Sequence, residues 1–350
     1  MTSRGQGAAF DRLAERIRKA WLDANPTEAT RTEPGGKLDS RLADFSRAGI
    51  RAQEAVFAGF LVDLRAIDPA DLDATRRLDW RVVEGYLASE LAWREARPHS
   101  SCYPQSYLDE IVLGLHWLFV ADLPDRDQLL HSLLHRLKAA AEVLRAAREN
   151  LESPPTVFTE TAAMAARGVI EFVHGDLRGA WRETKDAKLR GHLDAAADRL
   201  ELALGEFVEF LEGQVILQSN GDVGVGREIF ERILRERHGI DLSVEELVRV
   251  GQRVYHESLR ALKLAAEECR PGAIWTELWE EIESESIESP DPLGDLERAV
   301  GKVRRFVEAR GLVDLPEHEE LSYRATQSFL RPIVPRVQYT PPTPTDPRQR

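Results

Sequence analysis

The sequence predicts an all-α fold, a large multi-helix, bundle-like array followed by an extended proline-rich tail. Apolar residues recur at helical spacing over most of the 350 residues, and no region keeps the strict alternation of a half-buried strand. Six prolines lie in the last twenty residues, where they fix φ and remove backbone donors. We therefore expect a helical domain over residues 1–330 and an extended tail or connector over residues 331–350.

Turn residues and capping residues divide the helical part. A first helix is expected over residues 10–24, because proline restricts Asn25 in Asn25-Pro26, and residues 27–37 are expected to form a loop. Ser243 and Glu246 have the spacing of a capping box that opens a helix running to about Cys269. The other expected helices are 39–64, Asp68 to Trp93, 103–120, 127–149, 156–175, 187–217, 227–237, one between Pro271 and Pro290, and 293–310.

The charge balance argues against an anionic partner. The chain has 47 basic and 60 acidic residues, a net charge of -13, which repels nucleic acid and anionic membrane surfaces. Residues 275–297 contain no lysine or arginine and many glutamates. This acidic segment fits either a solvated helix face or a docking surface for a basic partner.

Several observations predict a cytoplasmic protein. Two cysteines, Cys102 and Cys269, are too few for a disulfide framework and form no Cys-x-x-Cys pair. Residues 1–20 are charged throughout and do not resemble a secretory signal. The most apolar run, residues 111–121, is too short to cross a bilayer, so we expect no membrane span.

Two histidines have the spacing of zinc ligands. His131 and His135 lie one helical turn apart, but the glutamate of a His-Glu-x-x-His motif and an evident third ligand are absent, so two surface or interface histidines are the preferred interpretation. His256-Glu257 and His318-Glu319 also lack the second histidine. We therefore predict no metal ligand in this chain.

Other candidate sites have ordinary structural explanations. Asp122, Asp125 and Asp127 flank Pro124, which breaks the helix that a diphosphate-binding motif would need, and Asp125 or Asp127 more simply caps the next helix. The glycines of residues 221–226 match no phosphate loop and indicate a turn. The seven tryptophans are spread along the predicted helices without a basic stripe and are interpreted as core or interface residues.

Several stretches, in this order, resemble the N-terminal portion of the bacterial family called domain of unknown function 885. They are Asn25-Pro26 with the four residues that follow, residues 36–46, Leu78-Asp79-Trp80, residues 224–230, residues 241–247, Ser328 to Pro332 and Tyr339 to Pro342. The resemblance implies a largely helical zinc metallopeptidase fold whose His-Glu-x-x-His helix lies farther downstream. That helix is absent from this sequence, so no residue here is assigned a catalytic, cofactor-binding or metal role.

The resemblance leads to a functional hypothesis with an alternative. The chain is expected to be the helical half of a zinc metallopeptidase-like protein, contributing one wall of a substrate cleft and inactive by itself. Zinc would enter only with a separately encoded catalytic half; a homo-oligomer is the other expected assembly. The alternative is a non-enzymatic helical scaffold or binding protein, and a third hypothesis, an enzyme using Asp122 and Asp125, has the least support.

Overall fold

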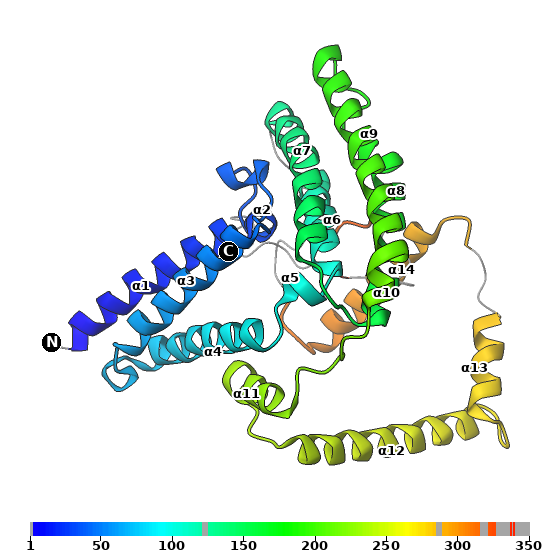
Figure 1. Cartoon of the computed structure of the whole chain (residues 1–350). Coiled ribbons are helices and arrows are strands. Elements are labelled where there is room, and N and C mark those ends of the chain that lie inside the picture. The colour runs from blue at the N-terminus through cyan, green and yellow to red at the C-terminus, as the bar shows by residue number, and fades with distance from the viewer. Residues whose placement is uncertain are drawn as a thin grey trace. The chain divides into compact units, whose positions relative to one another are not determined.

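The computed structural model describes residues 3–120, 125–284, 289–315 and 321–326, together with residues 337 and 339. Within these ranges the chain contains helices and no strand, which confirms the all-α prediction (Figure 1). The boundary expected at residue 330 and most of the proline-rich tail lie outside the described residues, and these expectations stay predictions.

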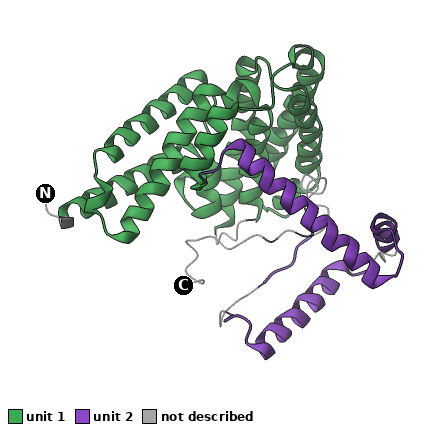
Figure 2. Cartoon of the chain, turned by 90° about the horizontal axis from the view of Figure 1, so that it is seen from below, with its two compact units in different colours: residues 1–240, 326–348, 350 green, residues 241–325, 349 purple. Residues whose placement is uncertain are grey.

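Contacts between residues divide the chain into two compact units, which Figure 2 shows in different colours. Among the described residues, the first comprises residues 3–120 and 125–240 together with 326, 337 and 339, and the second comprises residues 241–284, 289–315 and 321–325. Unit 1 contains α1 (Ser3–Ala24), α2 (Pro26–Thr32), η1 (Lys37–Ser40), α3 (Arg47–Arg65), η2 (Pro69–Asp71), α4 (Ala74–Ala96), α5 (His99–Cys102), α6 (Gln105–Val120), α7 (Arg126–Asn150), α8 (Thr156–His174), η3 (Leu177–Ala180), α9 (Ala187–Phe210), η4 (Leu211–Val215), α10 (Ile216–Gln218) and α11 (Arg227–His238). Unit 2 contains α12 (Val244–Cys269), α13 (Trp275–Ser284) and α14 (Pro292–Arg310).

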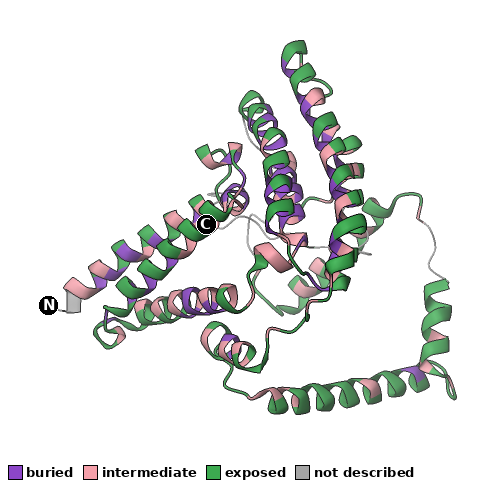
Figure 3. Ribbon diagram, in the orientation of Figure 1, coloured by how far each residue is buried: buried purple, intermediate pink, exposed green. Residues whose placement is uncertain are grey.

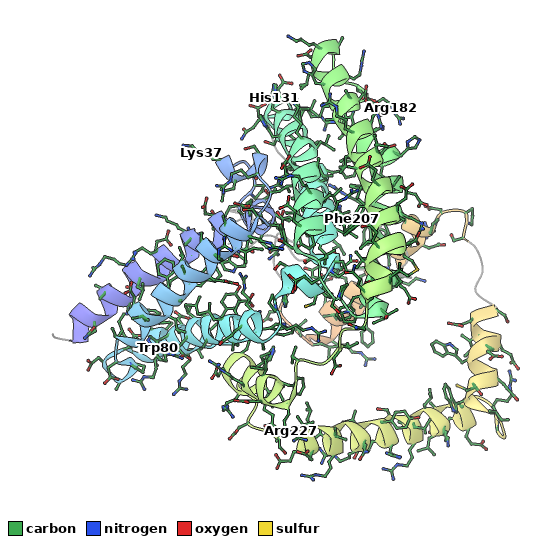
Figure 4. The ribbon with its side chains drawn as sticks, viewed as in Figure 1. Lys37, Trp80, His131, Arg182, Phe207 and Arg227 are labelled. Carbon is green, nitrogen blue, oxygen red and sulfur yellow. The ribbon has the colours of Figure 1, made fainter. Side chains whose placement is uncertain are left out.

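The larger core of unit 1 lies among α6, α7, α8 and α9. Helix α9 packs on α7 and α8, and α6 packs on the same two helices, so the four form a bundle. Its interior includes Leu115, Leu133, Phe172, Leu193 and Phe207, none of which is measurably exposed. Figure 4 labels Phe207 on α9. Each such side chain stabilises the fold by about 1.5–3 kcal/mol relative to an exposed one.

A smaller core joins α1, α3 and α4. Phe10, Leu13 and Ile17 form the apolar stripe of α1 and pack with Phe57 and Leu64 of α3 and Leu87 of α4. The indole nitrogen of Trp80, labelled in Figure 4, donates a hydrogen bond to the carbonyl oxygen of Leu64 at 3.0 Å. The family-like Leu78-Asp79-Trp80 stretch therefore serves packing between α3 and α4 through Trp80.

Helix α11 crosses α4 at a glycine. A Cβ atom added to Gly85 of α4 would lie 1.9 Å from the carbonyl oxygen of Glu236 in α11, a distance that real Cβ atoms do not show. Arg237 of the same helix lies over the Tyr86 ring at 5.1 Å and 3.4 Å from Glu90. The absence of a side chain at Gly85 thus permits the two helices to pack together.

Substitution Gly85→Ala is expected to push α11 away from α4 and to lower the free energy of unfolding by about 1–3 kcal/mol, the usual effect of overpacking. Urea denaturation measures this change, and hydrogen exchange should show faster exchange in α11. Gly59→Ala in α3 is the matched control, because no atom lies within 4 Å of the added Cβ and alanine favours helix by about 0.5–1 kcal/mol. Equal stability of the two variants would contradict this account of the crossing.

Two sequence expectations near the N-terminus were wrong. Residues 27–37 do not form a continuous loop, because Pro26 occupies the first turn of α2 and only the later residues, including Pro34 and Gly35, form turns. Asp39 does not start the next helix. It is buried in η1, and α3 begins after Ser46, whose hydroxyl accepts a hydrogen bond from the Gly49 amide.

Most other helix boundaries follow the capping signals. Asp68 caps a 3₁₀ turn, whereas Asp73 caps α4, so the helix expected from Asp68 starts a few residues later. The helix expected over 187–217 is α9, continued by the π-helical turn η4 and the short α10. The capping box of Ser243 and Glu246 is present as predicted.

Candidate functional site

The most buried charged group of unit 1 is the guanidinium of Arg136 in α7. Its Nε atom donates to the Arg41 carbonyl at 2.8 Å, and one terminal nitrogen donates to the Gly114 carbonyl of α6. The other donates to the Thr30 hydroxyl at 2.6 Å and to the carbonyl oxygens of Pro26 and Leu38 at 3.2 and 3.3 Å. Arg136 therefore ties residues 26–41 to the four-helix bundle.

Two carboxylates accompany this cation. Asp39, 1% exposed, accepts hydrogen bonds from the Thr30 hydroxyl and the Gly35 amide, both at 2.7 Å. Glu110 of α6 accepts from the Thr27 hydroxyl at 2.8 Å and the Ala43 amide at 2.7 Å. We call Arg136, Thr30, Asp39 and Glu110 the Arg136 network.

Burial dominates the electrostatics of the Arg136 network. It lowers the pKa of Arg136 to about 10, while Asp39 and Glu110 oppose that shift. Burial also raises the pKa of Glu110, against the hydrogen bonds from Ala43 and Thr27 and the charge of Arg136. All three guanidinium nitrogens of Arg136 donate hydrogen bonds within the protein, and the side chain has no measurable exposure. The Arg136 network therefore stabilises the fold and offers no substrate site.

The Arg136 network explains part of the family-like sequence. Pro26, Thr27 and Thr30 come from the first resembling stretch, and Asp39 comes from the second. All four are buried. Sequence reasoning missed Arg136, although an arginine between Leu133-Leu134 and Leu137 in an apolar helix face was a readable signal for a buried, fully bonded cation.

The histidine pair lies on the exposed side of α7. His131, labelled in Figure 4, and His135 are both exposed. Throughout the part of the chain that the structure describes, no group of three or more His, Cys, Asp or Glu side chains could hold a metal ion. The described residues therefore do not fit a zinc site. His318 lies outside them, and the exposed His256 contacts the Gln252 carbonyl of its own helix at 2.6 Å.

The remaining sequence candidates are structural where they are described. Asp125 accepts a hydrogen bond from the Gln128 amide at 3.0 Å and caps α7, as predicted, whereas Asp122 lies outside the described residues. Residues 221–226 form no helix and bend at residue 223, and of their three glycines only Gly226 has a positive φ, 82°, which glycine adopts without strain. Cys102 and Cys269 are free thiols.

Unit 2 presents apolar surface instead of a core. Helices α13 and α14 contain no buried residue, and the one buried residue of α12 is Ala266. Figure 3 shows α12 exposed along nearly its whole length. Large apolar side chains are left at the surface, including Val254 and Tyr255 of α12 and Val303 of α14 at 51%, 64% and 61% exposure. An amphipathic helix obtains most of its stability from packing of its apolar face, which these helices lack within unit 2.

Comparison with known proteins assigns the chain to a family. The family profile described as a bacterial protein of unknown function, DUF885, matches residues 26–350. This chain belongs to the DUF885 family. No protein with a curated description matches it. Among the helices that the structure describes, none combines the length and apolar character that a membrane crossing requires.

A solved structure has the same fold as this DUF885 chain. It is a protein of unknown function from Shewanella oneidensis, described as a candidate lipoprotein, with a TM-score of 0.70 and 17% sequence identity. The match covers 97% of this chain and 63% of the Shewanella protein. This DUF885 chain thus spans less than two thirds of the length of that structure.

Proposed function

We propose that this chain is the helical part of a zinc metallopeptidase-like DUF885 protein, that it forms a wall of the substrate cleft, and that a separate polypeptide supplies the catalytic part. The observation that carries the proposal is the apolar surface of unit 2, where α12, α13 and α14 together bury one side chain, Ala266. Exposed apolar surface of this extent is characteristic of an interaction site.

The relation to longer proteins supports the same proposal. The Shewanella structure shares the fold over nearly this whole chain and contains chain beyond the matched 63%. The described residues do not provide a zinc site, so the ligands and the general base would come from the other polypeptide. Hydrolysis of peptide or amide bonds would then be a property of the assembly.

The test is elemental analysis of the purified chain, alone and after co-expression with the reading frame that follows its gene. We expect about one zinc ion per complex, because a catalytic zinc site uses three protein ligands and a water molecule. The chain alone should contain no stoichiometric zinc and should not hydrolyse peptides. In this chain, the double substitution His131→Ala and His135→Ala should leave the zinc content of the complex unchanged, since both side chains are exposed and no third ligand accompanies them among the described residues.

The second candidate function is a non-enzymatic helical binding protein. It is favoured by α13, in which Glu277, Glu280 and Glu283 are exposed beside the half-exposed Trp279. Glu281 is held by Arg270 at 2.6 Å, so the acidic surface is partly ordered. Absence of zinc from both the isolated and the co-expressed samples would contradict the peptidase-like proposal and leave this second function as the better account.

A further inference from the structure

The apolar face of α12 has a regular composition. Val254 follows Leu247, Tyr255 follows Val248 and Leu262 follows Tyr255 by seven residues each. Two helical turns separate each pair, so the five side chains of Leu247, Val248, Val254, Tyr255 and Leu262 share one side of the helix. Val248, Val254 and Tyr255 are 52%, 51% and 64% exposed. We call these five residues the α12 stripe. It runs along most of a helix of 26 residues, about 39 Å long at 1.5 Å per residue.

A glycine lies in the middle of the α12 stripe. Gly251 is one turn from Leu247 and from Val254 and Tyr255, and a Cβ atom built on it would meet no atom within 4 Å. Glycine is among the poorest helix formers, so an exposed glycine in the interior of a helix weakens that helix without a gain inside this chain. Ser258, seven residues later, also has a small side chain on the same side. Such positions permit another backbone to approach closely.

We propose that the α12 stripe is the seat for one amphipathic helix of the catalytic polypeptide, packed against the α12 backbone at Gly251 and Ser258. The inference rests on the proposed function and names the surface through which the two parts join. The bulky residues on either side of Gly251 would form the walls of the contact, and large apolar residues of the incoming helix would lie over the small ones.

The choice of occupant follows from chain length and charge. The fold is shared with a longer protein over 97% of this chain, so that protein carries additional chain which could cover this face. A lipid surface fits poorly, because the basic residues of α12 are offset by its glutamates, and the following helix α13 carries glutamates and no lysine or arginine. A second copy of this chain could also cover the α12 stripe, and the experiment below distinguishes a dimer from the complex proposed here.

The experiment measures binding of the co-expressed downstream polypeptide to variants at Gly251. Gly251→Leu adds apolar area to the stripe but fills the point of closest approach. Helix-to-helix docking therefore predicts affinity at least tenfold weaker, whereas nonspecific apolar association predicts equal or tighter binding. Gly251→Ala should fall between the native chain and the leucine variant. Neither substitution should disturb the isolated chain, because both residues favour helix and the space is open.

The matched control is Arg253→Leu, which adds similar apolar bulk on the opposite side of α12 and should change the affinity less than twofold. A zinc-containing complex that forms equally well with Gly251→Leu would overturn this inference and leave the proposed function standing. Failure of the native chain to bind the downstream polypeptide would overturn both. A dimer of the native chain that Gly251→Leu dissociates, found by light scattering in place of that binding, would assign the stripe to a second copy and overturn the occupant proposed here.

Discussion

Arg136→Met is expected to lower the free energy of unfolding by about 3–5 kcal/mol, the cost of removing one partner from a buried charge network. Methionine fills part of the volume but donates no hydrogen bond. The carbonyl oxygens of Arg41, Gly114, Pro26 and Leu38 each lose the hydrogen bond that Arg136 donates, and the cation beside Asp39 and Glu110 disappears. Urea denaturation followed by circular dichroism measures the loss.

Arg145→Met on the same helix is the matched control. Arg145 pairs with Glu142 and Glu149, and its side chain is 62% exposed. Exposed pairs of this kind contribute about 0–1 kcal/mol, so this variant should remain close to the native chain. If Arg136→Met lost no more stability than Arg145→Met, the Arg136 network would not be what holds residues 26–41 on the bundle.

A second consequence of Arg136→Met separates its role from general packing. The segment with α2 and η1 should exchange its amide hydrogens faster than the α8–α9 contact, which does not involve Arg136. Uniformly faster exchange throughout unit 1 would instead indicate global destabilisation. The position of the segment that contains Pro26, Thr30 and Asp39 would then depend on the core as a whole and not on the Arg136 guanidinium.

Helix existence was readable from the sequence because it depends on short-range patterns. The periodic apolar positions located most of the helices, and local caps such as Ser243 with Glu246 fixed their ends. The error at residues 27–37 overlooked a local signal, Pro26 in the first turn of α2, whereas the error at Asp39 has a long-range cause. Thr30 and Asp39 are bound to each other and, through Thr30, to Arg136, more than ninety residues away. No local signal of turn or cap chemistry reports such a contact.

The apolar surface of unit 2 was less predictable from the sequence than the fold, for a related reason. The amphipathic pattern of residues 244–269 predicted a helix but not whether its apolar face would find a partner. The same apolar periodicity is found in a helix that packs in the core of its own chain and in a helix that binds another chain. The exposure of Val254 and Tyr255 distinguishes these cases. Gly251 was the stronger sequence signal for a partner, since a glycine within a predicted helix either weakens that helix or permits another backbone to approach it closely.

His116 in α6 is expected to make the fold acid-sensitive. Its side chain is 7% exposed, and burial lowers its pKa from 6.5 to about 4. The unfolded chain therefore binds a proton more readily than the folded chain over this interval. The stability associated with neutral His116 is fully present above about pH 6.5 and is lost as the pH falls toward 4, by about 3 kcal/mol in total.

Buried carboxyl groups on the same helix act in the opposite direction. Burial raises the pKa values of Asp109 and Glu110, so these groups favour the folded state increasingly as the pH falls toward their pKa values. The native pH profile is the sum of these effects, and only a difference between variants isolates His116. His116→Gln removes the titrating imidazole and retains both carboxyl groups.

The difference in unfolding free energy between the native chain and His116→Gln should therefore shrink by about 3 kcal/mol between pH 7 and pH 4, or reverse in sign if glutamine packs nearly as well. Urea denaturation at several pH values measures it. His135→Gln on the exposed side of α7 should show the native pH profile. A difference that stays constant with pH would contradict this prediction. It would mean that protonation of His116, buried against Trp117, costs the folded state no free energy.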